Sequence, residues 1–265
     1  MVCAECGQEL AARRTGRPRR YCSRSCQGRA YRRRRDQGRF SAVVHSPPTG
    51  AQSQTSLDLA IAIADAEGIS ALSLGRLAHR AGVALAVVQR DFGSRDRLVA
   101  LMVQRIYGSL PWRTDAPAEP VQALVRLAEL EWRSYRAHPW LVGVLASTRP
   151  PLVPAVLESA RAAIDLFRGL GLDAGTALNR YLALSAYIQG MGLLLTSEQQ
   201  EAVHSGTGPD SWWGSELRRL DRSGATRRHP WLVELADQPA AGAFDVDDAF
   251  HDGLRQVVAG LVAVP

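Results

Sequence analysis

The four cysteines of this 265-residue chain all lie near its start and are spaced like ligands for one metal ion. They form two close pairs, Cys3-x2-Cys6 and Cys22-x3-Cys26. Two such pairs let four thiolates converge on a tetrahedral Zn²⁺ with no open coordination position, so the metal would be structural. Disulfides and free thiols are the alternatives. Because no secretory signal is visible, we expect a cytoplasmic protein with reduced cysteines and a zinc module over residues 1–40.

Positive charge is concentrated in the same segment. Residues 1–40 hold twelve Arg against three acidic residues, a net charge of +9, whereas the whole chain carries +6. An arginine-rich segment binds phosphates with an affinity independent of base sequence. The stretch that contains Arg17, Arg19 and Arg20 suits a narrow minor groove of DNA. RNA binding and simple solubility are the alternatives for this segment.

A small polar linker with two adjacent prolines is expected over residues 41–56, and four short helices are expected over residues 55–107. Apolar residues recur at helical spacing in each helix, and Ser73 and Ser94 are placed as N-caps. A short turn that contains Gly82 joins the second and third helices. Two helices joined in this way, behind a first helix that buries them, are typical of a helix-turn-helix. Because this motif reads duplex DNA, we favour DNA over RNA as the partner of the arginine-rich segment.

The apolar and glycine positions of these helices follow one spacing pattern, carried by Ala62, Gly68, Leu74, Leu77, Ala78, Ala81, Gly82, Val83, Phe92 and Leu98. In this pattern about fifty residues resemble the DNA-binding domain of TetR-type (tetracycline-repressor-like) regulators. The cysteine segment also resembles zinc-binding extensions that precede this domain in some members. The resemblance implies that the third helix, from Ala84 to Phe92, enters the major groove of DNA.

Contacts with DNA are expected from the exposed residues of this third helix and from the start of the next one. Asp91 would repel phosphates unless it pairs with Arg90 or Arg95. Residues 51–98 contain five Arg and five acidic residues, so we hypothesise that the N-terminal Arg module supplies the missing long-range attraction. The expected contact residues are Ala84, Leu85, Ala86, Gln89, Arg90 and Arg95.

Residues 119–265 are expected to form a helical domain, and the resemblance implies that this domain binds a small-molecule effector and a second subunit. The resemblance implies a homodimer held by helices at 173–203 and 246–262, and a flexible rim is expected over 205–214. Aromatic side chains at helical spacing are more often plain core than ligand contacts. The candidate effector contacts are the aromatic and polar side chains Trp132, Tyr135, Trp140, Arg149, Tyr187 and Gln189.

The sequence contains no membrane span and no Gly-rich phosphate loop, GxSxG or HExxH motif, so no enzyme is expected. Acidic pairs such as Glu129 and Glu131 are expected on solvated helix faces. The chain therefore predicts an all-α, ligand-responsive repressor that acts as a homodimer on palindromic double-stranded DNA. The alternative is a zinc-stabilised RNA-binding or adaptor protein with a degenerate helix-turn-helix, which Ala84, Gln89 and Asp91 would suggest.

Overall fold

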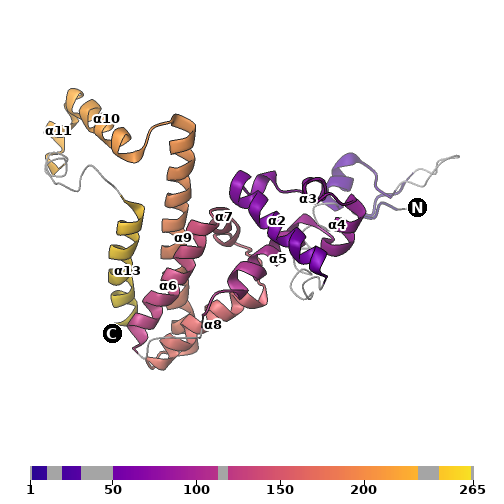
Figure 1. Ribbon diagram of the computed structural model, residues 1–265, viewed down its shortest axis with the longest axis horizontal. Coiled ribbons are helices and arrows are strands. Elements are labelled where there is room, and N and C mark those ends of the chain that lie inside the picture. Colours follow the sequence, from indigo (N-terminus) through magenta and orange to yellow (C-terminus); the bar gives the residue numbers. More distant parts are fainter. Residues whose placement is uncertain (1, 11–19, 31–49, 113–118, 232–244, 264–265) are drawn as a thin grey trace.

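The computed structural model describes residues 2–10, 20–30, 50–112, 119–231 and 245–263. Within these ranges the regular structure is helical, apart from one isolated bridge between Val2 and Glu9. The expected all-α fold is therefore confirmed. Figure 1 shows a helix-turn-helix head on one side of the molecule and a taller helical bundle on the other.

The helix-turn-helix head is a three-helix unit that leads into a longer connecting helix. Helix α2 begins at Ala51, so the last six residues of the segment expected as linker are helical, and Ser53 and Ser56 are buried. Most of the rest of that segment lies outside the described residues. The elements of the head are α2 (Ala51–Glu67), η1 (Ile69–Ala71), α3 (Leu74–Ala81), α4 (Leu85–Phe92) and α5 (Arg95–Gly108).

The ends of these helices are set by local sequence. The Ser73 hydroxyl accepts a hydrogen bond from the backbone N–H of Arg76 at 3.1 Å, and Ser94 caps α5 through Arg97 in the same way. Gly82 ends α3 in the left-handed conformation at φ 65°, which a side chain would disfavour. The apolar faces then meet in a core to which Leu57, Leu77, Val88, Phe92 and Leu98 contribute.

The C-terminal bundle is built around the longest helix, α9, which packs against α6, α8 and α13. Its helices are α6 (Pro120–Ala137), α7 (Trp140–Leu145), α8 (Pro154–Gly169), α9 (Ala174–Ser205), α10 (Pro209–Arg222), α11 (Ala225–Arg228) and α13 (Val246–Val262). The expectation of a flexible rim over 205–214 is wrong, because α10 begins at Pro209. Within the described ranges, no helix combines the length and apolar character that crossing a bilayer requires.

The head and the bundle share one core and are joined by polar contacts. Helix α5 leaves the head and packs against α8 (Figure 1). The Asp65 carboxylate of α2 accepts a hydrogen bond from Trp140 Nε1 at 2.7 Å, and the same oxygen lies 2.9 Å from His138 Nδ1. Further along, the backbone N–H of Ala155 donates to the Gln104 side chain at 3.0 Å. These contacts join α7 and α8 directly to helices of the head.

Candidate functional site

The four cysteines converge on one point. All four sulfur atoms lie within 4.8 Å of one another, with Cys22 Sγ 3.5 Å from that of Cys6 and 3.4 Å from that of Cys26. Cys3 and Cys6 lie in a loop that is closed by the bridge between residues 2 and 9. Cys22 lies just before a helix over residues 24–30, and Cys26 lies within that helix. Four sulfur donors brought together from two chain segments could hold a metal ion.

The surroundings of the cluster favour thiolates at some positions and oppose them at another. Backbone N–H groups of Cys6 and Glu5 lower the pKa of Cys3 to about 6. The pKa of Cys26 is lowered first by the Ser23 hydroxyl and also by Arg29, whose Nη2 lies 3.0 Å from the sulfur.

Hydrogen bonds shared with the thiols of Cys26 and Cys6 raise the pKa of Cys22 to about 12. All four cysteines would be thiolates together only with a cation bound among them. Of the arginines expected to contact DNA from this segment, Arg20 is described and exposed beside the cluster. Arg17 and Arg19 lie outside the described residues.

Helix α4 presents one face to solvent and buries the other. Val88 and Phe92 are buried against the head. The backbone of Ala84 precedes the helix without a side-chain cap, because alanine has no hydroxyl that could accept a hydrogen bond. The residues expected to contact DNA from this helix are all exposed: Ala84, Leu85, Ala86, Gln89 and Arg90.

Asp91 is turned toward the protein and not outward with that face. Its carboxylate accepts a hydrogen bond from Ser53 Oγ at 2.8 Å and pairs with Arg90 Nε at 3.0 Å. The pKa of Asp91 is lowered first by the Ser53 hydroxyl and then by Arg90. From the sequence we expect Asp91 to repel phosphates unless it pairs with Arg90 or Arg95, and the structure shows the pairing with Arg90. The bond to Ser53 was missed, because that residue fell within the expected linker.

Arg95 is occupied by the protein's own backbone. Its Nε donates to the carbonyl of Leu72 at 2.8 Å, and its Nη2 donates to the carbonyl of Ile69 at 2.5 Å. These carbonyls belong to the connection between α2 and α3. Arg95 therefore holds the turn that leads into the helix-turn-helix through two hydrogen bonds, which we call the Arg95 clasp. The spacing of residues along the sequence does not predict this arrangement.

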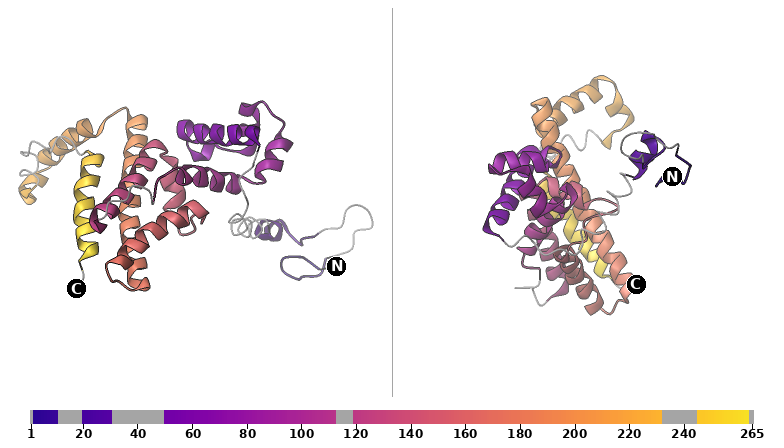
Figure 2. Two further views of the ribbon diagram at one scale, coloured as in Figure 1. Left: turned by 60° about the horizontal axis from the view of Figure 1, so that its bottom comes forward. Right: turned by 90° about the vertical axis from the view of Figure 1, so that its right-hand side faces the viewer.

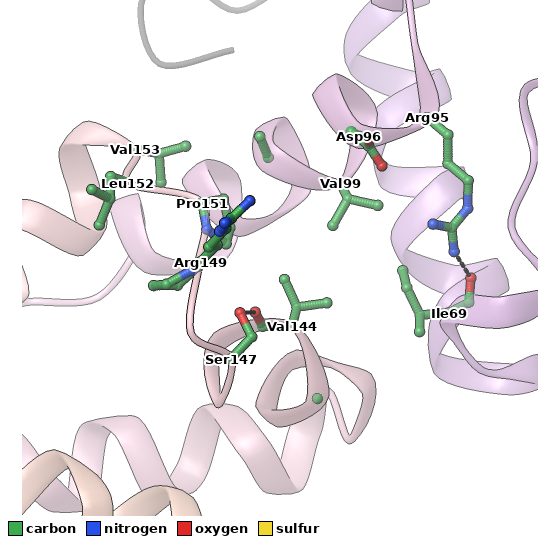
Figure 3. A pocket seen from close by; sticks show the side chains of 13 residues that line it. Ile69, Arg95, Asp96, Val99, Val144, Ser147, Arg149, Pro151, Leu152 and Val153 are labelled. Carbon is green, nitrogen blue, oxygen red and sulfur yellow. Dashed lines mark hydrogen bonds between the residues drawn. The ribbon is translucent and has the colours of Figure 1, made fainter. Parts of the chain in front are cut away.

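A cavity of about 290 Å³ lies where the head meets the bundle. Figure 3 shows Arg95 and Arg149 on opposite sides of it, with Val99 and Val144 between them. The wall on the bundle side is the end of α7 and the loop that leads to α8, which includes Leu152. The cavity thus borders both parts of the molecule.

The six residues expected to contact an effector do not gather in one place. Arg149 lines the junction cavity, whereas Trp140 bonds to α2. Trp132 stacks on Phe250 of α13 with ring centroids 4.2 Å apart, and the Tyr187 hydroxyl donates to the Phe250 carbonyl at 2.8 Å. Trp132, Trp140 and Tyr187 thus help to hold helices together.

The other two candidates, Tyr135 and Gln189, belong to a polar cluster inside the bundle. The Tyr135 hydroxyl donates to Glu131 at 2.5 Å, and Gln189 donates to Ser185 at 3.2 Å. Tyr107 lies close enough to Glu131 for the two to affect each other's pKa, yet its buried hydroxyl makes no standard hydrogen bond among the described residues. The expectation that Glu131 is solvated is wrong: its side chain is partly buried, and burial raises its pKa.

The long helix α9 leaves apolar side chains uncovered. Leu178, Leu182, Leu193 and Leu194 are between 45% and 52% exposed. Helix α13 runs beside α9, on the side of the bundle away from the cysteine cluster (Figure 2). Exposed leucines in this number on one helix indicate a surface that another protein covers.

A helix-turn-helix head, joined to a helical bundle with an uncovered apolar face, defines the class of the helix-turn-helix regulators of transcription. The family model described as "Tetracyclin repressor-like, C-terminal domain" matches residues 117–264. The chain therefore belongs to the tetracycline-repressor-like family, and it is a DNA-binding regulator of transcription, as the sequence predicted. The RNA-binding alternative is not favoured.

Known relatives agree with this assignment. The chain is 26% identical over 214 residues to the "HTH-type transcriptional repressor DrrR1" of Streptomyces coeruleorubidus, covering 77% of this chain and 75% of that one. ActR of Streptomyces coelicolor in complex with actinorhodin is 27% identical, with a TM-score of 0.65 over 81% of this chain and 96% of ActR. TetR of Acinetobacter baumannii AYE, at 20% identity and a TM-score of 0.53 over 78% and 94%, shares the fold.

Proposed function

We propose that this protein is a repressor that binds a palindromic operator as a homodimer and leaves it when a small molecule binds. The observation that carries this proposal is the exposed face of α4, which includes Leu85, Gln89 and Arg90, on a head fixed by capped helices. A helix held in this way can enter the major groove. The name of DrrR1 and the complexes of ActR with actinorhodin and (S)-DNPA support a ligand-responsive repressor.

The homodimer is assigned to the face of α9 together with α13. The exposed leucines of α9, such as Leu178 and Leu182, would otherwise remain in water at a cost of about 25 cal/mol per Å² of apolar surface. A two-fold axis through this face places two reading heads side by side, and that geometry matches an inverted repeat in DNA.

The cysteine cluster is assigned to a structural Zn²⁺ held by Cys3, Cys6, Cys22 and Cys26. The four sulfurs suit this metal, and a segment this short folds only when the metal binds. Elemental analysis should find one zinc per chain, and the Cys22→Ser variant should lose it. A protein without zinc whose cysteines are paired in disulfides, detected by mass spectrometry after alkylation in denaturant with a chelator and no reductant, would contradict the assignment.

Selection from random duplex DNA with the purified, zinc-loaded protein tests the function as a whole. An enriched inverted repeat, bound by two chains, is the expected result. The Gln89→Ala variant should bind the same duplex less tightly, because a side-chain contact with a base edge contributes about 1–3 kcal/mol. If no duplex is enriched, or if single-stranded RNA competes equally well, the proposed function is wrong.

A further inference from the structure

The junction cavity is lined by apolar side chains and by more basic than acidic residues. Its floor is apolar, with Val99 of α5 and Val144 of α7 facing the space (Figure 3). Two guanidinium groups, Arg95 and Arg149, stand at its edges. Asp96, the single acidic residue among those that line the cavity, is engaged by another group. The surroundings therefore combine apolar surface with a net positive charge.

The two arginines differ in how they are used. Arg149 is exposed and makes no hydrogen bond or ion pair within the described part of the chain. Arg95 donates to two neutral carbonyls, those of Ile69 and Leu72. A carboxylate is a stronger acceptor for a guanidinium than a backbone carbonyl, because the bond is charge-assisted and can be bidentate. An anion in the cavity can therefore compete for Arg95.

Movement of Arg95 would alter the reading head. Arg95 is the first residue of α5, directly after the Ser94 cap, so its guanidinium joins the start of α5 to the connection between α2 and α3. Helix α3 begins two residues after Leu72 and packs on α4, which carries the exposed DNA-facing residues. Loss of the clasp removes two hydrogen bonds that fix this connection.

We propose that the junction cavity binds a small organic anion with an apolar body, of the aromatic carboxylate class, between Arg149 and Arg95. The ligand draws Arg95 away from the carbonyls of Ile69 and Leu72 and so disfavours the DNA-binding form of the head. This inference rests on the proposed repressor function and names the ligand class and the route of its effect. A ligand that binds one form of the head better than the other shifts the equilibrium by that difference.

Titration calorimetry of the full zinc-loaded chain with benzoate, 1-naphthoate and anthracene-9-carboxylate tests the ligand class. At least one carboxylate should bind, and its neutral counterpart with a CH₂OH group should bind at least about tenfold more weakly. Arg149→Gln should weaken binding of the carboxylate by a similar factor. Arg168→Gln removes the same charge from the far end of α8 and should change nothing. Binding of none of the three acids, or equal binding to Arg149→Gln, overturns the proposal.

A second pair of variants tests whether the acid binds in the junction cavity, and both variants keep Arg95 and Arg149. Ser147 is exposed and lines the cavity near Arg149. Ser147→Asp places a carboxylate there and should weaken binding of the acid by about tenfold or more, while Ser147→Asn, of equal size and without charge, should not. Equal binding by both variants, with unchanged melting temperatures, would place the ligand elsewhere.

The regulatory step is measured on the duplex recovered by selection. The bound acid should lower the affinity for that duplex, and by reciprocity the duplex should lower the affinity for the acid by the same factor. Arg95→Lys keeps the charge but cannot hold both carbonyls, so it should bind DNA more weakly without ligand and respond less to the acid. If the acid binds and leaves DNA affinity unchanged, the proposed route is wrong. If no duplex is selected, the repressor function fails instead, and calorimetry still reports on the cavity.

Discussion

At the scale of single residues, the chain places ionisable groups where their charge is costly. Glu131 is partly buried in the bundle, where Tyr135 donates to its carboxylate and no Arg forms a salt bridge with it among the described residues. Burial is the main cause of its raised pKa, ahead of the opposing effect of the tyrosine hydroxyls. The folded protein therefore holds the Glu131 proton more tightly than the unfolded chain does.

This raised pKa makes stability depend on pH. Stability contributed by the protonated form is present below the ordinary pKa of 4.5 and is lost as pH rises through the higher folded value. The Glu131→Gln variant keeps the acceptor for Tyr135 and removes the titration, so its melting temperature should fall less than that of the wild type as pH rises from below 4.5. Melting curves at several pH values check this, with Glu129→Gln on the same helix as the control. Parallel curves for wild type and Glu131→Gln would show that folding does not raise the pKa of Glu131.

At the scale of elements, local signals predicted most of the head. Ser73, Ser94 and Gly82 act within a few residues of their own position, so their roles could be inferred from the sequence. The bond between Asp91 and Ser53 joins residues 38 apart. The Arg95 clasp likewise depends on tertiary packing, which the spacing of residues does not specify. The effector candidates are dispersed for the same reason, because aromatic side chains at helical spacing serve equally well as core.

One close approach between helices leads to a prediction at this scale. A Cβ atom on Gly192 of α9 would lie 2.9 Å from the Tyr135 ring and 3.0 Å from Val142, whereas one on Gly75 of α3 would meet nothing within 4 Å. Gly192→Ala should therefore destabilise the protein by about 1–3 kcal/mol. Gly75→Ala should cause no loss, because alanine is favoured over glycine in helices. Urea unfolding measures both, and equal stability of the two variants would contradict the packing of α9 on α6.

At the scale of the whole molecule, the basic segment of the sequence and the uncovered apolar face belong to different parts of the chain. The first 40 residues carry a net charge of +9 and the remaining residues −3, whereas the uncovered leucines lie on α9. Figure 2 shows the cysteine module on one side of the molecule, away from α9 and α13. We therefore expect the proposed attraction of the basic segment to DNA and the proposed pairing of two chains to be separable by mutation.

The Leu182→Arg variant tests whether the exposed leucines of α9 form the dimer interface. Leu182 is 52% exposed in the single chain, so a charge there should leave the fold intact and prevent pairing of two chains. Sedimentation velocity should show a monomer, with weaker binding to an inverted repeat. Leu157→Arg on α8, at a site that is 49% exposed, should remain a dimer. A dimeric Leu182→Arg protein would move the interface away from this face of α9.

Deletion of residues 1–44 tests whether the arginine-rich N-terminal segment contributes to DNA binding. Each contact between an arginine and a phosphate contributes about −0.9 to the slope of log affinity against log salt concentration. The shortened chain should bind the selected duplex more weakly and with a shallower slope. Fluorescence anisotropy at several salt concentrations gives both quantities. Unchanged affinity and slope would show that the module does not contact DNA.

One carboxylate oxygen of Asp65 forms hydrogen bonds with both Trp140 and His138. This shared contact has a consequence for protein engineering. Biosensors are often assembled by grafting the operator-reading portion of one regulator onto the sensing portion of another. Here the graft boundary would separate an acceptor in α2 from donors at the start of α7. A donor scaffold that lacks a carboxylate at this place would yield a chimaera whose two halves fold but no longer communicate, and restoring Asp65 with its two partners should return the response.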